Sequence, residues 1–161
     1  DGMEAQARRA KFHAFILGHV EGRRTALFTL GVYRRGVPDS VLEQFVGVHT
    51  EYSTAIYETH LEDYKTAILK VVSSLDNKPG DVTVMTSAED ASFREPVMIG
   101  FRLTAGGGTY KIVDVQVAGI WLSVEQRDQF GSLLARNNGD VAALPSELAK
   151  RTADIRAAKA S

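Results

Sequence analysis

The sequence predicts an α+β fold in which a helical layer packs on a four-stranded antiparallel curved sheet. Two changes of periodicity lead to this prediction. Apolar residues recur every three to four positions up to about residue 66, alternate with period two from about residue 67 to 119, and return to helical spacing from about residue 123. Short, glycine-containing connections join the strand-like segments. We therefore expect a single domain over residues 1–161, with helices at about 3–66, strands at about 67–119 and helices at about 123–159.

Composition limits the classes of function. Apolar residues make up 44% of the chain and charged residues 24%, which is typical of a folded domain. Nineteen basic and twenty acidic residues leave no basic excess, so no nucleic-acid partner is expected. No apolar run approaches the roughly 20 residues that span a bilayer, which predicts a soluble protein rather than an integral membrane protein. The absence of cysteine excludes disulfides and thiolate sites.

The first third of the chain is expected to be helical. In AQARRAKFHAFILGHV, Phe12, Phe15, Ile16 and His19 or Val20 follow the spacing of an amphipathic helix. A second short helical segment, RRTALFTLGVYRRG, contains two glycines, Gly31 and Gly36, that are typical of a helix end. These elements form the first part of the predicted helical layer.

A third helix has a recognisable start. Ser40 followed by Glu43 fits a capping box, in which each side chain bonds a free backbone donor of the first turn. Beyond this start the apolar residues of the segment follow one helical stripe: Val41, Leu42, Phe45, Val48, Tyr52 and Ile56.

Four segments rich in Val, Ile and Phe predict the strands: ILKVVSSL, DVTVMTSA, PVMIGFRL and TYKIVDVQVAG. AGGG, before the last of them, is interpreted as a hairpin turn, because neither Gly-Lys-Ser/Thr nor a helix follows it. Downstream, Ser123 and Gln126 fit a second capping box, and Asp140 is expected to cap a short helix.

Side chains with catalytic or metal-binding spacing are missing. His13, His19, His49 and His60 do not form a metal motif, and no Gly-x-Ser-x-Gly nucleophile elbow is present. We therefore expect no metal, no cofactor and no catalytic residues.

Asp114 is the one charged residue whose position requires an explanation. It lies in the middle of a predicted strand, where a carboxylate is costly unless it is paired or faces solvent. Simple alternation places it on the face opposite Val113 and Val115. One interpretation is a structural carboxylate held by Arg102 or Arg127. The other is a buried acid with a raised pKa, as in small cone-shaped isomerases.

A family resemblance is carried by YKIVDVQVAGIWLSVEQRDQF. This segment resembles the C-terminal signature of the toluene-tolerance/MlaC family of periplasmic phospholipid-binding proteins. The matching residues are Tyr110, Lys111, Asp114, Gly119, Ile120, Leu122, Arg127 and Phe130. Upstream, comparable places are held by Leu30, Gly31, Tyr33, Phe45, Tyr52 and Tyr57. Trp121 and Arg34 depart from the pattern, because the family usually has a small Ser at the first position and often Trp at the second.

The resemblance implies an MlaC-like, NTF2-like cone that encloses an apolar lipid cavity. It also implies a periplasmic shuttle that works with membrane-associated ABC transporter components and carries a phospholipid. Because Trp121 is unusual, a hopanoid or sterol-like polycyclic lipid is kept as a variant. The residues expected to line the cavity are Phe28, Leu30, Phe45, Val48, Tyr52, Ile56, Ile99, Phe101, Val113, Val115, Val117, Ile120 and Trp121.

Two alternatives remain open at this point. The first is a small cone-fold enzyme of the isomerase type, which would use Asp114 with Tyr52 or Tyr110 on an apolar substrate. The second is an adaptor domain with a solid interior, because the same apolar residues can equally fill a core.

Overall fold

A computed structural model describes residues 2–159; residues 1, 160 and 161, at the ends of the expected domain, lie outside the described part. The α-helices are α1 (Gly2–His19), α2 (Gly22–Thr29), α3 (Asp39–Glu62), α4 (Leu122–Arg136) and α5 (Leu144–Ala158). Two short 3₁₀ helices, η1 (Gly31–Arg34) and η2 (Val141–Ala143), connect them. In the described part of the chain, no helix is both long and apolar enough to cross a membrane.

The sheet is antiparallel and follows chain order. Its strands are β1 (Ile68–Lys78), β2 (Asp81–Glu89), β3 (Val97–Gly106), β4 (Thr109–Val117) and β5 (Ile120–Trp121), in the order β1-β2-β3-β4-β5. The predicted α+β fold is confirmed, and the two residues of β5 add a fifth strand to the four expected. Gly107 and Gly108 have φ values of 59° and 81°, so the predicted hairpin turn is a tight two-residue connection with both central residues in the left-handed region.

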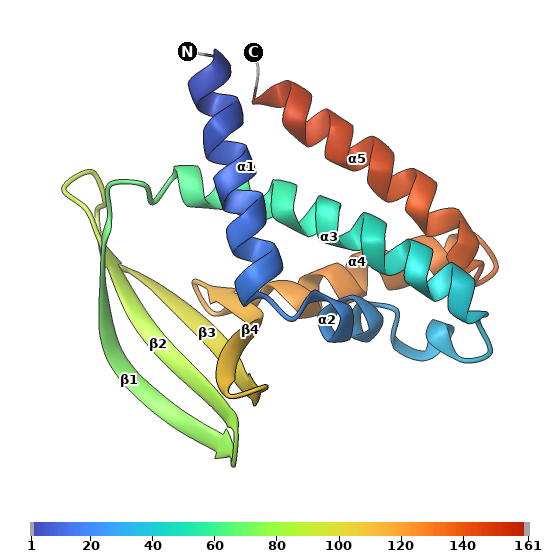
Figure 1. Cartoon of the computed structure of the whole chain (residues 1–161), viewed down its shortest axis with the longest axis horizontal. Helices are drawn as coiled ribbons and strands as arrows, with labels where there is room; N and C mark the ends of the chain where they lie inside the picture. The colour runs from blue at the N-terminus through green and yellow to red at the C-terminus, as the bar shows by residue number, and fades with distance from the viewer. Residues whose placement is uncertain (1, 160–161) are drawn as a thin grey trace.

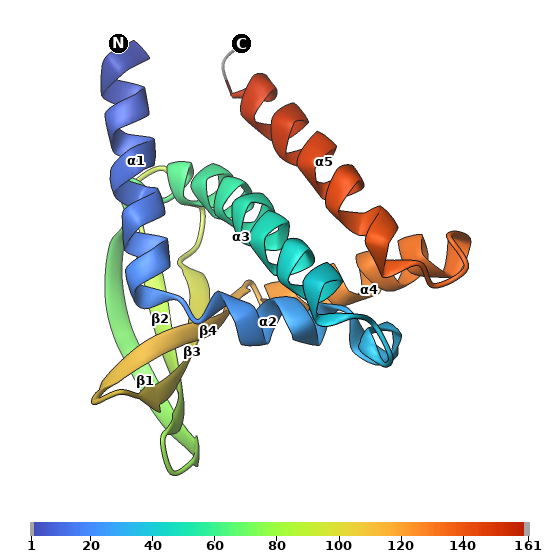
Figure 2. The same ribbon diagram turned by 45° about the vertical axis from the view of Figure 1, so that its right-hand side comes forward.

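The sheet and most of the helices occupy different ends of the molecule. The sheet curves away on one side, while α2, α3, α4 and α5 gather on the other, and α1 stands over the junction (Figures 1 and 2). The buried hydrophobic core lies at the helical end, where α3 and α5 run side by side. Its members are Ala26, Leu30, Phe45, Tyr52, Phe130, Leu134, Val141, Leu144 and Leu148.

Helix starts follow the sequence only in part. The side chain of Asp140 accepts a hydrogen bond from the Ala142 amide at 3.0 Å, so the predicted cap at this position is confirmed. The capping box predicted at Ser123 and Gln126 is wrong, because α4 begins earlier, after Trp121, and no side chain caps it. Both polar residues instead face inward from the first turns of α4 and bond partners on other elements.

Candidate functional site

An apolar cavity of about 290 Å³ lies between the sheet and the helices α1 and α3. Its sheet wall is made of β3 and β4. In the antiparallel register, Ile99 pairs with Val117 and Phe101 with Val115, so these four side chains share one face. All four line the cavity.

A β-bulge on β4 changes which residues reach the cavity. Arg102 pairs with Asp114 and Leu103 with Ile112, which leaves Val113 as an extra residue. Because of this shift, Ile112, Val113 and Asp114 all line the cavity. The simple alternation expected from the sequence is therefore wrong at this point of β4.

Helix α3 turns a polar face to the cavity. His49, Ser53, Thr54 and Tyr57 line it, at positions that recur along one side of the helix. The apolar stripe of α3 faces the other helices instead. Packing against α4 and α5 buries more apolar surface than a cavity wall does, which explains why the more hydrophobic side points that way.

The helical residues that were expected to line the cavity lie elsewhere. Leu30, Phe45 and Tyr52 belong to the buried helical core, and Val48 and Ile56 pack against it. Phe28 and Trp121 line a second, more polar hollow of about 440 Å³. Ile120, the first residue of β5, is 57% exposed. The expected residues that do meet at the cavity all come from the sheet: Ile99, Phe101, Val113, Val115 and Val117.

Helix α1 supplies cavity residues that the sequence reasoning missed. Phe15, Ile16, Leu17 and Val20 line the cavity. Phe15 and Ile16 had been recognised as one face of an amphipathic helix, but nothing local in the sequence indicates what that face covers. A contact just after α1 places this face over the sheet: the Glu21 amide donates to the Ile112 carbonyl of β4 at 2.8 Å.

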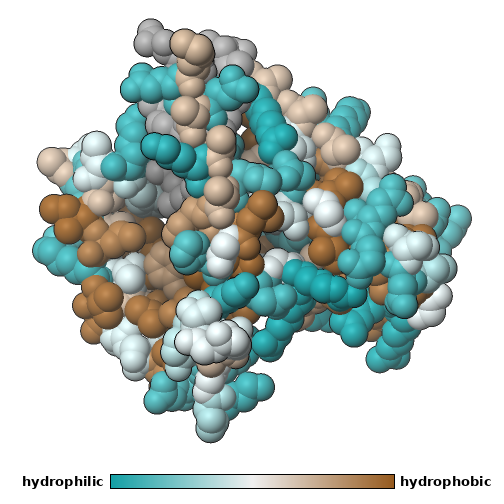
Figure 3. Space-filling model, viewed as in Figure 1, coloured by the Kyte–Doolittle hydropathy of each residue, from teal (hydrophilic) through white to brown (hydrophobic). Residues whose placement is uncertain are grey.

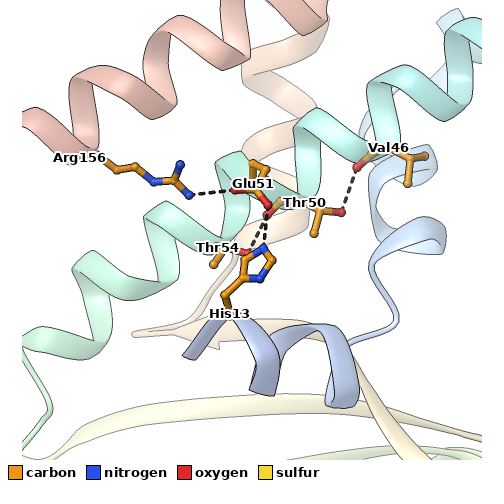
Figure 4. Close-up of polar contacts among 6 residues, drawn as sticks. All are labelled: His13, Val46, Thr50, Glu51, Thr54 and Arg156. Carbon is orange, nitrogen blue, oxygen red and sulfur yellow. Dashed lines mark hydrogen bonds and ion pairs between the residues drawn. The ribbon is translucent and has the colours of Figure 1, made fainter. Parts of the chain in front are cut away.

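A polar network holds the middle of α1 against the rest of the helical layer. His13 Nε2 lies 2.7 Å from Glu51 Oε1 on α3, and Arg156 of α5 donates to Glu51 Oε2 at 2.9 Å (Figure 4). The Arg156 hydrogen bond, with a smaller contribution from His13, lowers the pKa of Glu51. One carboxylate thus links three helices, including the one that covers the cavity.

Asp114 has a structural set of partners. Its carboxylate accepts hydrogen bonds from the Val115 amide at 2.9 Å, from the Ser123 amide at 3.1 Å and from the Ser123 hydroxyl. Burial raises the pKa of Asp114, and the hydrogen bonds from Ser123 oppose that shift. These bonds fasten the start of α4 to β4.

The arginines expected to hold Asp114 are engaged elsewhere. Arg102 forms a bidentate pair with Asp81, at 2.9 and 2.7 Å, and Arg127 lies over the ring of Phe28. The prediction that Arg102 or Arg127 bonds this carboxylate is therefore wrong; Arg102 acts on Asp114 only through its charge, which opposes the rise in the pKa of Asp114. The backbone and Ser123 are nearer because α4 starts only five residues beyond β4.

The tyrosines of the isomerase alternative do not accompany Asp114 at the cavity. Tyr52 is buried in the helical core and Tyr110 is 52% exposed. Two other tyrosines, Tyr57 and Tyr64, line the cavity together with Asp114, and it is Tyr57 on which the charge of Asp114 acts. In the sequence, Tyr57 was noted only as one of the residues in places comparable to the family pattern.

His49 is a buried polar residue at the inner end of the site, 3% exposed. Its Nε2 lies 2.8 Å from Gln126 Oε1, and Nδ1 has no partner in the described part of the chain. Burial lowers the pKa of His49 to about 4, so the ring is neutral at physiological pH. Within residues 2–159, no three His, Asp or Glu side chains come together as a metal site.

The cavity opens onto an apolar surface. Phe15, Leu17 and Leu69 line it and are nevertheless 47%, 58% and 53% exposed. Beside them β1 is exposed along its whole length. Figure 3 shows apolar side chains gathered on the side of the molecule where this strand lies. The exposed large apolar residues of β1 are Ile68, Leu69, Val71, Val72 and Leu75.

Comparisons with known proteins agree with this architecture. The family model for the MlaC protein matches residues 1–150. A solved structure of a phospholipid-binding protein from Ralstonia solanacearum, in complex with a phospholipid, superposes with a TM-score of 0.77 at 18% sequence identity. The match covers 92% of this chain and 84% of that one, and it establishes the shared fold. No curated protein matches the chain.

Proposed function

The chain belongs to the MlaC family, and we propose that it is a periplasmic shuttle that carries a phospholipid between membrane-associated transport complexes. The family consists of non-enzymatic lipid-binding proteins and is typically periplasmic. Membership confirms the prediction that the chain is not an enzyme. The related solved structure holds a phospholipid, which supports the same kind of cargo here.

The observation that carries the proposal is the apolar cavity between α1, α3 and the sheet. Moving an acyl chain into water costs about 0.8 kcal/mol per methylene, so two chains of ordinary length cost on the order of 20 kcal/mol. A cavity walled by Ile99, Phe101 and Val115 offsets part of this cost without any catalytic group. Such a site needs only shape and apolar surface.

The open mouth suits a carrier that receives and releases its cargo. Phe15, Leu17 and Leu69 extend the apolar surface from the interior to the outside, so acyl chains can remain in apolar contact beyond the cavity itself. A charged head group would then stay in water, where its hydration is retained. We propose membrane-associated ABC transporter components as the partners at each end of the transfer.

A polycyclic lipid is the second candidate cargo. It was suggested by Trp121, whose bulk was expected to reshape the cavity. In the structure Trp121 lines the separate, more polar hollow together with Phe28, so it does not alter the apolar cavity. Phospholipid is therefore the cargo that we favour, and the experiment below tests both classes.

Mass spectrometry of organic extracts from detergent-free protein tests the proposal. We expect one bound phospholipid per chain, and loss of most of it in Val115→Trp, which fills the cavity. The matched control is Ile120→Trp, which adds the same ring at a residue that is 57% exposed. A polycyclic lipid in place of phospholipid would change the cargo class. Absence of any lipid, even after incubation with vesicles, would contradict the carrier function.

A further inference from the structure

The two walls of the cavity differ in chemistry. The sheet wall is apolar except for Asp114, whereas α3 contributes hydroxyl and imidazole groups. A pure acyl-chain site gains nothing from polar atoms on its wall, because each one must find a hydrogen-bond partner or remain unsatisfied. The polar groups therefore need to be accounted for one by one.

Most polar groups of the α3 wall are satisfied within the protein. Thr50 donates to the Val46 carbonyl at 2.9 Å and Thr54 to the Thr50 carbonyl at 2.7 Å, as Figure 4 shows. Ser53 accepts from Gln126 Nε2 at 3.3 Å. These hydroxyls have partners of their own and need no ligand.

Tyr57 is the exception among the hydroxyl groups of this wall. Its hydroxyl has no hydrogen-bond partner among the described residues, although the side chain lines the cavity. In the described part, Nδ1 of His49 is the only polar side-chain atom that is both unpartnered and sealed from solvent. The unpartnered Tyr57 hydroxyl is therefore accessible to a ligand. Burial, with a contribution from the charge of Asp114, raises the pKa of Tyr57. The phenol is thus neutral and able both to donate and to accept.

Asp114 is the complementary group on the opposite wall. Its carboxylate accepts three hydrogen bonds within the protein, and a carboxylate has sites for about four. Its charge acts on Tyr57, yet no hydrogen bond joins the two side chains. The Asp114 carboxylate and the unpartnered phenol therefore line the same cavity, and Asp114 also borders the more polar hollow that contains Arg102.

The pair selects one kind of ligand group. A phosphate accepts from Tyr57 but is repelled by Asp114, and an ester carbonyl accepts but has no proton for the carboxylate. An ammonium group can donate to both side chains, but it leaves the phenol proton without an acceptor, and burying its charge in an apolar cavity is costly. A hydroxyl group donates to the carboxylate and accepts from the phenol.

We propose that Tyr57 and Asp114 form a recognition point for a hydroxyl group on the buried part of the cargo lipid. This inference rests on the proposed carrier function and adds a preference to it. A hydroxylated acyl chain and a polycyclic alcohol share the required chemistry. The cavity thereby distinguishes such lipids from unsubstituted ones of equal size.

Competition against a fluorescent phosphatidylcholine, which carries no hydroxyl group, tests the inference. The competitors are two matched pairs: 1-hexadecanol with hexadecyl methyl ether, and cholestanol with its methyl ether. Each ether keeps the acceptor oxygen and loses the donor. We expect at least one alcohol to compete about 10-fold better than its ether, since a hydrogen bond to a charged group is lost. A preference in the first pair indicates acyl chains, and one in the second indicates polycyclic lipids.

Tyr57→Phe provides the second readout. It removes an oxygen without a protein partner, so the alcohol preference, taken as the ratio of affinities within each pair, should fall several-fold whatever the substitution does to phosphatidylcholine binding. Tyr64→Phe, which removes a phenol hydroxyl elsewhere on the cavity wall, is the control and should keep the preference. Equal affinities within both pairs, or no effect of Tyr57→Phe, would overturn the inference and leave the carrier function intact. Failure of phosphatidylcholine itself to bind would instead refute the carrier function.

Discussion

The helical end and the sheet end of this protein treat their apolar side chains in opposite ways. At the helical end, Phe45 and Phe130 are completely buried and meet edge to face. At the sheet end, Val71 and Leu75 of β1 are 72% and 65% exposed. Similar residue types thus serve as a packed core in one region and as open surface in the other. The difference indicates that stability is concentrated in the helices, while the sheet keeps apolar surface available for a ligand.

Truncating one apolar residue at each end tests this division most strongly. Phe130→Ala should lower the free energy of unfolding by about 3–5 kcal/mol, because it leaves a cavity among Phe45, His49 and Tyr52. Val71→Ala should cost less than about 1 kcal/mol, because the side chain is already in water. Urea unfolding measures both values. Equal losses would mean that the exposed face of β1 contributes to the core after all.

Between pH 7 and pH 5, most of the pH dependence of stability should come from His49 at the helical end. The pKa of His49 falls from 6.5 to about 4 on folding, so the unfolded state binds the proton more tightly. Stability is therefore complete above pH 6.5 and decreases as the pH falls towards 4. By linkage the loss between pH 7 and pH 5 is about 2 kcal/mol.

Urea unfolding at several pH values checks this prediction. His49→Phe should be less stable at neutral pH, because the amide oxygen of Gln126 loses its partner, but its stability should change little between pH 7 and pH 5. His60→Gln, an exposed substitution on the same helix, should retain the wild-type slope. A wild-type slope in His49→Phe would show that another group titrates with folding.

The smallest effect is expected at the junction between the two ends. His13→Ala removes the contact between His13 and Glu51. Both side chains are about 40% exposed, so the free energy of unfolding should change by less than about 1 kcal/mol. Amide exchange in α1 should nevertheless become faster, since this contact joins its middle to α3. His19→Ala is the control, because His19 bonds only the Phe15 carbonyl of its own helix. Unchanged exchange in His13→Ala would show that α1 is held by its apolar contacts alone.

Local sequence patterns determined the elements of this protein. Periodicity predicted the helices and strands, glycines predicted the β3–β4 turn, and Asp140 predicted its cap, because each depends on backbone preferences within a few residues. The resemblance of the segment from Tyr110 to Phe130 indicated the family, which the match over residues 1–150 confirms. Among the cavity residues, Ile99, Phe101 and Val115 were also foreseen, since strand alternation assigns them to one face.

Only the tertiary structure decided which face of α3 meets the cavity. The sequence shows an apolar stripe with Phe45 and Tyr52 and a polar stripe with Ser53 and Tyr57, but periodicity does not say what each stripe faces. The apolar stripe packs on α4 and α5, because burial between helices gains more than contact with an open space. That choice leaves Tyr57 beside the cavity, and the bulge on β4 brings Asp114 to the same space. The positions of Tyr57 and Asp114 at the cavity both depend on contacts between segments far apart in the chain, which no local pattern encodes.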